Sequence, residues 1–427
     1  MLVGAFFLLY LRVPPGQSPL VGRAPLIGAV FERFLPYPTL PLGLDAFRRT
    51  CVGLVLAMWA AYGGAVFLVS RSTGAPDRGR LLQLLTGLTL VAHVVLVLLP
   101  PVFSTDLFFY GLFGKMILAG GNPYLAPADS LSGDPLWAYA SWTHLRSHYG
   151  PTFQWVSTGA AWLGGGGPLG TALAFKAVFA LFNLLACWTV WRLARLRPGD
   201  DGLGALALYA LNPLVLIEGP GQAHSEGIMI PLALLGLLLW LQGRPLTGFA
   251  ALIASAAVKY ITGVLALLVA VKMVAEAPPG ARLKTAGGLL GVSLLVGIAL
   301  YAPFSGGGAV FDAAINLVVM GSSLDRSRYG EPPATPVAGL IVFAVALVVA
   351  VPLAARLARP YLLDLTAALV SLFVLLVLWW KMPWYFVTAM ALTIPGGPTR
   401  SIRALRLLAL LLGLLSTFLY CTLVPSA

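Results

Sequence analysis

Long apolar runs separated by short polar turns dominate the chain. The run from Leu82 to Phe103 is long enough to form a helix across a lipid bilayer, which needs about 20 apolar residues. Of all 427 residues, 59% are hydrophobic and only 10% are charged, and the mean hydropathy is +0.90. This composition is far more apolar than that of a soluble globular protein. The sequence therefore predicts an all-α polytopic membrane protein, a single membrane domain of about 12–13 transmembrane helices over residues 1–427.

The apolar runs also give the expected positions of the helices. The predicted spans lie near 51–70, 82–103, 168–191, 203–217, 228–241, 245–258, 261–274, 284–303, 336–355, 361–379, 384–398 and 403–424. Residues 1–12 are expected to form a short or interfacial helix. Residues 151–163 are expected to return to the face that they left, because the break Gly164-Gly165-Gly166-Gly167-Pro168 follows them.

Basic residues cluster in alternate turns. The clusters are Arg71, Arg78 and Arg80; Arg192, Arg195 and Arg197; Lys272, Arg282 and Lys284; Arg356 and Arg359; and Arg400, Arg403 and Arg406. Cytoplasmic loops are rich in Lys and Arg, so all five clusters are predicted to be cytoplasmic. The unusual polar residues then gather at the external, periplasmic face of a plasma or inner membrane.

Charge and cysteine content exclude other classes of protein. The net charge of +12 is expected to set topology, not to bind nucleic acid, because most cations flank apolar runs. The three cysteines lie in apolar runs, which indicates neither a disulfide framework nor a metal site. The N-terminus lacks the basic start of a secretory signal peptide. The predicted external loops are too short to form a soluble domain with its own core.

The first predicted external loop, residues 104–150, begins with an acid at the end of an apolar run. Asp106 can remain ionised at the bilayer surface, where it would either anchor the loop or act in chemistry. Residues 106–118 predict an amphipathic helix lying on the membrane surface, and Gly120-Gly121-Asn122-Pro123 ends it. Asp129 and Asp134, further along, are typical turn acids.

A second polar group follows the end of the predicted span 203–217, after Asn212-Pro213. Glu218, His224 and Glu226 lie in a glycine-rich turn between two apolar runs. Ser225 or Glu226 could cap the next helix, since polar and acidic residues are favoured at helix starts. No second histidine at helical spacing accompanies His224, so zinc binding is not indicated.

A lone lysine and two later groups complete the polar set. Lys259 interrupts an apolar stretch with no partner nearby in the sequence, so we expect it either to reach the membrane surface or to pair with a phosphate. Arg326 and Arg328 lie in the loop 304–335, and an aromatic and cationic turn surrounds Lys381.

The order of these short motifs resembles that of a known superfamily. The motifs are Ser104-Thr105-Asp106 with Tyr110, Gly121-Asn122-Pro123-Tyr124, Tyr149-Gly150-Pro151, Asn212-Pro213 with Glu218, Gly221-x-x-His224-x-Glu226, Lys259, and Pro383-Trp384-Tyr385. The chain resembles GT-C glycosyltransferases that use polyprenyl-phosphate sugars, and more closely the bacterial polyprenyl-phosphomannose-dependent α-mannosyltransferases, including the α-1,6 type. Ser225 stands where such enzymes commonly have asparagine.

The resemblance implies a helical bundle with surface helices in the first external loop, and a sugar, mannose by this resemblance, that moves from a polyprenyl-phosphate donor to a glycan or glycolipid acceptor. It assigns the role of catalytic base to Asp106. A single base suggests direct displacement with inversion. Neither an obligatory metal nor a cofactor is expected. The residues expected to contact substrates are Tyr110, Asn122, Tyr124, His148, Tyr149, Glu218, His224, Glu226, Lys259, Arg326, Arg328, Lys381, Trp384 and Tyr385.

Two other functions remain open from the sequence. A transporter or flippase for a polyprenyl-linked glycan would also need many spans, but it should hold polar residues between helices near mid-membrane. A structural or assembly subunit would leave the polar residues of the external face without a role.

Overall fold

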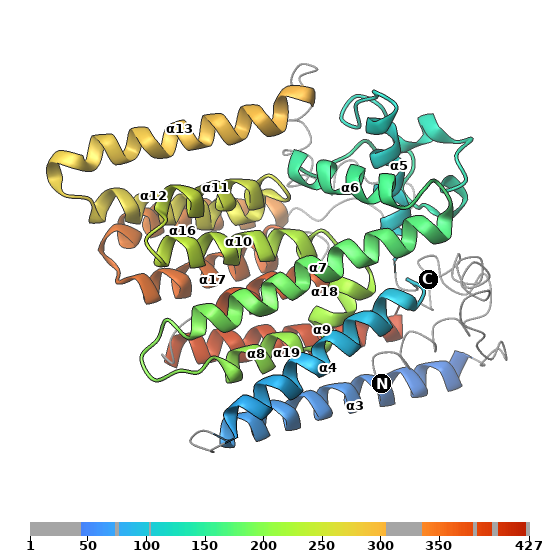
Figure 1. The fold of residues 1–427 in the computed structure, drawn as a ribbon, viewed down its shortest axis with the longest axis horizontal. Helices are drawn as coiled ribbons and strands as arrows, with labels where there is room; N and C mark the ends of the chain where they lie inside the picture. Colours follow the sequence, from blue (N-terminus) through green and yellow to red (C-terminus); the bar gives the residue numbers. More distant parts are fainter. Residues whose placement is uncertain are drawn as a thin grey trace.

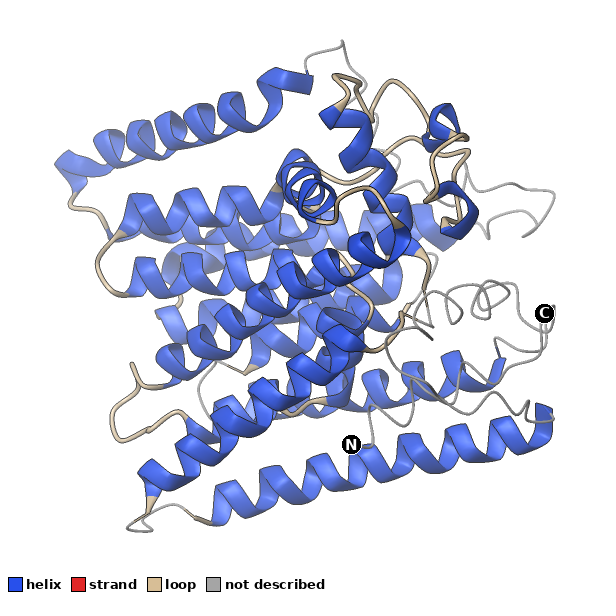
Figure 2. Cartoon of the chain, turned by 45° about the vertical axis from the view of Figure 1, so that its right-hand side comes forward, coloured by secondary structure: helices blue, strands red, loops and turns tan. Residues whose placement is uncertain are grey.

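The computed structural model describes residues 44–72, 77–101, 104–304, 335–378, 382–394 and 400–423. Within these ranges the chain is helical, with no strand (Figure 2). Arg326, Arg328 and Lys381 lie outside the described residues, as do residues 1–12. The protein is an all-α polytopic membrane protein, as the sequence predicted.

Five described helices are long and apolar enough to cross a membrane, and a bent pair makes a possible sixth. The long helices are α3 (Leu44–Arg71), α4 (Arg78–Leu98), α7 (Pro168–Ala194), α13 (Arg282–Tyr301) and α16 (Thr335–Arg356). Shorter helices occupy other predicted spans: α10 (Glu226–Leu241), α11 (Pro245–Ala256), α12 (Gly263–Glu276), α17 (Arg359–Leu376) and α18 (Pro383–Thr393). The last helix, α19, is Arg400–Leu423.

The predicted span 203–217 is not one straight helix. It consists of α8 (Leu203–Ala210) and a segment that begins with α9 (Pro213–Leu216), bent by 54°. Pro213 cannot donate a backbone hydrogen bond to the preceding turn, so the helix breaks there. Asn212 caps the new start, because its side chain accepts from the backbone N–H groups of Leu214 and Val215.

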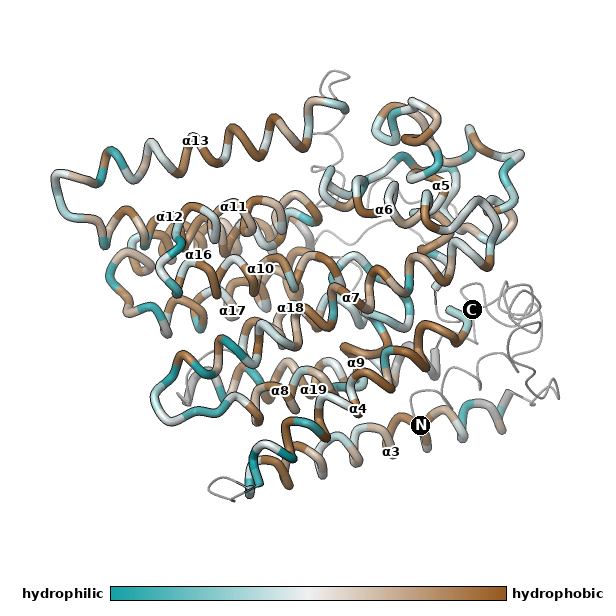
Figure 3. The backbone as a smooth tube through the Cα atoms, viewed as in Figure 1, coloured by the Kyte–Doolittle hydropathy of each residue, from teal (hydrophilic) through white to brown (hydrophobic). Residues whose placement is uncertain are grey.

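The basic turns lie together at one end of the bundle. The end of α3 and the start of α4, and the turns α7–α8, α12–α13 and α16–α17, are on the left in Figure 1, and hydrophilic colour marks several of them in Figure 3. The opposite end carries α5 (Asp106–Leu118) and α6 (Pro151–Leu163). This arrangement agrees with the alternation of charge in the sequence.

Helix α5 has the predicted bounds but not the predicted environment. The sequence analysis placed it on the membrane surface, yet Leu107 to Gly114 are all buried. Helix α6 packs along α5, and a glycine at 114 allows this, because a Cβ there would come within 2.5 Å of the Ser157 carbonyl oxygen. A helix that is apolar all round is usually buried. Helix α6 is more exposed than α5, and its Trp162 is 70% exposed.

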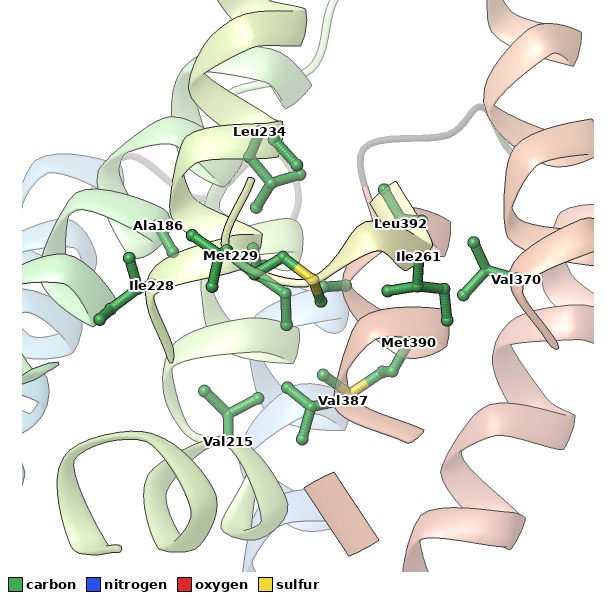
Figure 4. Close-up of a cluster of buried hydrophobic side chains, with 14 of the residues drawn as sticks. Ala186, Val215, Ile228, Met229, Leu234, Ile261, Val370, Val387, Met390 and Leu392 are labelled. Atoms are coloured by element: carbon green, nitrogen blue, oxygen red, sulfur yellow. The ribbon is translucent and has the colours of Figure 1, made fainter. Parts of the chain in front are cut away.

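The apolar core lies beneath the acid-bearing turns. In Figure 4, Met229 from the start of α10 points toward the same space as Val387 and Met390 from α18, whereas Ile228 lies beside Ala186 of α7. Ile261, two residues after Lys259, joins them. The core therefore fixes the elements from which the polar side chains emerge.

Candidate active site

Asp106 is the first residue of α5, where the helix dipole favours a negative charge. Its backbone N–H donates to the Ser104 hydroxyl at 3.1 Å, which closes a tight turn before the helix. The backbone N–H of Ser104 donates to Oε1 of Gln222 at 3.0 Å. The segment leading to Asp106 is thus attached to the turn that bears the other acids.

A π-helical turn over Ile217–Gly221 presents Glu218. Pro220 lies inside this turn, and Ala223 follows with a φ of +59°, a left-handed conformation that is unusual for a residue with a side chain. The backbone N–H of His224 then donates to the Glu218 carbonyl at 3.0 Å. π-Helical turns and strained backbone are often found at functional sites.

The reversal brings His224 between two carboxylates. Its Nδ1 lies 2.7 Å from Oε2 of Glu218, and its Nε2 lies 3.8 Å from Oδ2 of Asp106. The imidazole ring also stacks on Trp384 of α18, with ring centroids 4.0 Å apart. Three segments distant in the sequence therefore meet at one histidine.

Lys259 lies in the link between α11 and α12 and is buried. Its Nζ donates to Oε1 of Glu226 at 2.6 Å and lies 4.3 Å from the ring centroid of Tyr385. Asp106 is within electrostatic range of Lys259. Lys259 has no partner nearby in the sequence and was expected to reach the membrane surface or pair with a phosphate, but in the structure it pairs with Glu226, 33 residues away. Glu226 is thus an ion-pair partner and does not cap α10 through its side chain.

Two tyrosines connect Asp106 to the rest of its loop. The hydroxyl of Tyr110 donates to Oδ2 of Asp106 at 3.3 Å and lies 3.1 Å from the hydroxyl of Tyr149. Burial raises the pKa of both phenols, and the Asp106 carboxylate adds to the effect. Both hydroxyls therefore stay protonated at neutral pH and can act as donors.

The Tyr149-Gly150-Pro151 motif has a clear structural purpose. The backbone N–H of Gly150 donates to the Val258 carbonyl at 3.0 Å. A Cβ on Gly150 would lie 2.1 Å from the Ala257 carbonyl oxygen, so no other residue fits there. This close approach puts Tyr149 next to the segment that carries Lys259.

Other residues that were expected to contact substrates lie outside the cluster of Asp106, Glu218 and Glu226. The Asn122 side chain accepts from the Tyr124 backbone N–H and donates to the Phe304 carbonyl. The buried Tyr124 hydroxyl donates to the Tyr149 carbonyl at 2.8 Å. These two residues support the loop and do not join the acid cluster. The His148 ring packs on Tyr149.

Asp134, predicted to be an ordinary turn acid, forms an ion pair with Lys115 at 2.7 Å. Lys115 also donates to the Gly166 carbonyl, so one side chain joins α5, its loop and the glycine-rich turn.

Exposure separates the three clustered carboxylates. The side chain of Asp106 is 17% exposed, against 5% for Glu218 and 3% for Glu226. Asp106 is therefore the carboxylate that an incoming substrate can most readily reach. Among the described residues, no group of three or more His, Cys, Asp or Glu side chains is arranged to hold a metal ion.

Comparison with known proteins identifies the family. Residues 17–276 match the sequence model of the family described as "Alpha-(1->6)-mannopyranosyltransferase, N-terminal domain". The chain belongs to this family. The matched region includes Asp106, Glu218, His224, Glu226 and Lys259.

Individual relatives agree with the family match. The chain is 29% identical over 219 residues to alpha-(1->6)-mannopyranosyltransferase A of Mycobacterium tuberculosis, which covers 50% of this chain and 40% of that protein. It is 27% identical over 211 residues to alpha-(1->6)-mannopyranosyltransferase A of Corynebacterium glutamicum, covering 48% of this chain and 42% of that protein. The chain thus spans less than half the length of these relatives.

Proposed function

We propose that this chain is a membrane mannosyltransferase that moves mannose from a polyprenyl-phosphate donor to a hydroxyl of a glycan or glycolipid acceptor. Family membership supports the reaction type, and the acid cluster supplies groups that such a reaction needs. The observation that carries the proposal is Asp106: it is the most exposed of three clustered carboxylates and lies beside His224 and Tyr110.

The reaction needs a base, and Asp106 takes that role. The acceptor hydroxyl gives its proton to the Asp106 carboxylate as its oxygen forms a bond to the anomeric carbon of the donor sugar. The bond from that carbon to the phosphate oxygen breaks, and polyprenyl phosphate leaves with the bonding electrons. A single displacement inverts the anomeric centre, so a β-linked donor gives an α-mannoside. Tyr110 holds the carboxylate in place, and His224 and Glu218 orient the acceptor.

The leaving phosphate needs cations. Lys259 uses one hydrogen bond on Glu226, and its ammonium group has three N–H donors. The remaining donors can stabilise the negative charge that develops on the phosphate. We assign the second cation to Arg326, Arg328 or Lys381. Trp384 and Tyr385 then offer aromatic surface to the donor.

The proposed site faces the outside of the cell. The cluster lies in segments that end away from the basic turns, and basic turns are cytoplasmic in most membrane proteins. A donor carried on a lipid reaches this face within the membrane plane, and the acceptor approaches from the aqueous side.

The test is Asp106→Asn in the purified chain, in detergent, with labelled polyprenyl-phosphate mannose. The amide keeps the shape of the carboxylate but accepts no proton, so transfer should fall by about 10²–10⁴-fold with donor binding largely retained. The matched control is Asp129→Asn, an exposed acid of the same loop, which should leave transfer unchanged. Near-normal transfer by Asp106→Asn would exclude Asp106 as the base and point to Glu218 or Glu226.

A further inference from the structure

Helix α7 buries a lysine and an asparagine in addition to two threonines. Lys176 and Asn183 are seven residues apart, about two helical turns, and therefore share one face. Lys176 is 0% exposed and Asn183 is 1% exposed. Both lie inside the predicted span 168–191, away from the external face where the unusual polar residues were expected. An ionisable residue inside a membrane-spanning helix is costly and usually serves function.

Lys176 holds the end of α4. Its ammonium group donates to the carbonyl of Leu99, the residue that follows the last turn of this helix. Helix C-termini carry partial negative charge, so a cation is favoured there. The chain then passes through Pro100-Pro101 toward Asp106. Because Gln222 holds the Ser104 N–H, the connection from α4 to Asp106 is held near both of its ends.

Asn183 contacts the segment that carries Glu218. Its Oδ1 lies 3.0 Å from Nε2 of His93 in α4, whose Nδ1 lies 2.7 Å from the Thr89 carbonyl oxygen. A Cβ added to Gly219 would come within 2.9 Å of Nδ2 of Asn183, so the π-helical turn packs directly on this amide. Gly219 follows Glu218, the residue that contacts His224.

We propose that Lys176 and Asn183 are positioning residues: Lys176 sets Asp106 through the end of α4, and Asn183 sets Glu218 through the π-helical turn. The inference rests on the function proposed above. Lys176 holds the backbone seven residues before Asp106, and Asn183 packs against the residue that follows Glu218. One rigid helix therefore fixes the spacing between the two carboxylates.

The first test is Lys176→Met. Methionine is apolar and of similar length, so it removes the cost of burying an ammonium group but leaves the Leu99 carbonyl without this donor. Because the two effects oppose each other, the thermal midpoint should change little. The turnover number should fall by about 10–100-fold with the donor KM unchanged, since misplacement of a catalytic group by about 1 Å can cost 10²-fold. Lys176→Arg, which keeps a donor, should recover part of the turnover.

The control variant is Thr189→Val on the same helix. Thr189 is buried and donates only to the Leu185 carbonyl one turn earlier, away from both acids. It should change neither turnover nor KM. If Lys176→Met cannot be purified in folded form, Lys176→Gln is measured against the same criteria. Turnover within twofold of the parent, or a loss of turnover that merely follows a loss of folded protein, would overturn the proposal.

A double-variant cycle tests whether Lys176 acts through Asp106. Once asparagine replaces the base, the exact position of residue 106 no longer affects proton transfer. Adding Lys176→Met to Asp106→Asn should therefore lower the turnover number little below that of Asp106→Asn alone. Additive losses would show that Lys176 acts elsewhere and would reject the positioning role. If Asp106→Asn itself transfers sugar normally, the proposed function fails first, and the two failures are distinguished.

Asn183→Leu provides the parallel measurement. Leucine has nearly the same size but loses the contact with His93 and the amide beneath Gly219. We expect about a tenfold fall in turnover, which Glu218→Gln should make no worse. Asn183→Leu with normal turnover would leave α7 with a role at Asp106 alone and reject the two-point proposal.

Discussion

Two ion pairs, one in the acid cluster and one at the basic end of the bundle, use the same chemistry in opposite surroundings. Lys259 and Glu226 lie 2.6 Å apart with side chains 5% and 3% exposed. Arg359 and Glu276 lie 2.7 Å apart with side chains 44% and 32% exposed. The two distances alone would predict ion pairs of equal strength. Any difference in their contribution to stability must therefore come from their access to solvent.

The difference follows from solvation. An exposed pair forms little net interaction, because water and salt already stabilise each charge. A buried pair has lost its water, and removing one partner leaves an uncompensated charge. Arg359 also stacks over Trp240 at 5.0 Å and joins α17 to α12. We infer that the exposed pair fastens two helices, and that the buried pair holds a reactive cation ready for a ligand.

The largest effect is expected from breaking the buried pair. Lys259→Ala leaves the Glu226 carboxylate buried without its cation, although the Ser225 hydroxyl still donates to it, and should lower the free energy of unfolding by about 3–5 kcal/mol. Donor affinity and transfer rate should fall together. Lys259→Arg should recover part of both, since it keeps the charge but changes the geometry. Thermal unfolding and transfer assays measure the two effects.

A compensated variant separates the two roles of Lys259. Lys259→Met combined with Glu226→Gln removes both charges, so stability should return to near the parent value while transfer stays low. If this double variant transferred sugar at the parent rate, Lys259 would be a structural residue only, and the phosphate would belong to Arg326, Arg328 or Lys381.

The sequence could predict elements but not the contacts between them. The start of α5 at Asp106 and the end of α6 before the glycine-rich break were predicted, because apolar runs, glycine and proline act locally. The bend at Asn212-Pro213 was not predicted, since residues 203–217 were expected to form one span. The partner of Lys259 was not, because it depends on how α10 and α11 fold back on each other. Lys176 was missed because one charge hardly changes the hydropathy of a long apolar run.

The burial of α5 has a similar cause. Its apolar residues indicated one face against lipid, and only α6 and α7 packed around it decide that the face is covered. The acids of the site were found by their unusual position in an apolar chain. Their arrangement around His224 depends on Ala223 adopting a left-handed conformation, which no local pattern indicates.

A smaller, pH-dependent effect is expected at His148, in the loop next to the buried pair. Burial, with the Lys259 charge adding to it, lowers the pKa of His148 to about 3. The unfolded chain binds a proton near pH 6.5, which the folded chain does not bind until near pH 3. The contribution of His148 to the free energy of unfolding is therefore fully present well above pH 6.5. It is lost as the pH drops, and the free energy of unfolding falls by about 1 kcal/mol from pH 6.5 to 5.5.

Thermal unfolding between pH 5 and 8 measures this loss. His148→Gln should reduce the slope below pH 6.5, whereas His144→Gln, at an exposed side chain of the same loop, should leave it unchanged. An equal slope in the parent and in His148→Gln would mean that His148 takes up its proton over the same pH range in the folded and the unfolded chain, and would contradict the lowered pKa.

The smallest effect is expected from the exposed pair. Arg359→Ala removes a two-pronged contact with Glu276 and the stacking on Trp240, yet Lys272 remains 3.5 Å from the same carboxylate. Because Glu276 keeps a cation and water, the free energy of unfolding should fall by no more than about 1 kcal/mol. Raising the salt concentration should shrink the difference, since exposed charges are screened. Transfer should be unchanged, because the pair lies at the end of the bundle away from Asp106. A loss as large as that of Lys259→Ala would mean that exposure does not decide the strength of these pairs, and the distinction between a fastening pair and a ligand-ready pair would fail.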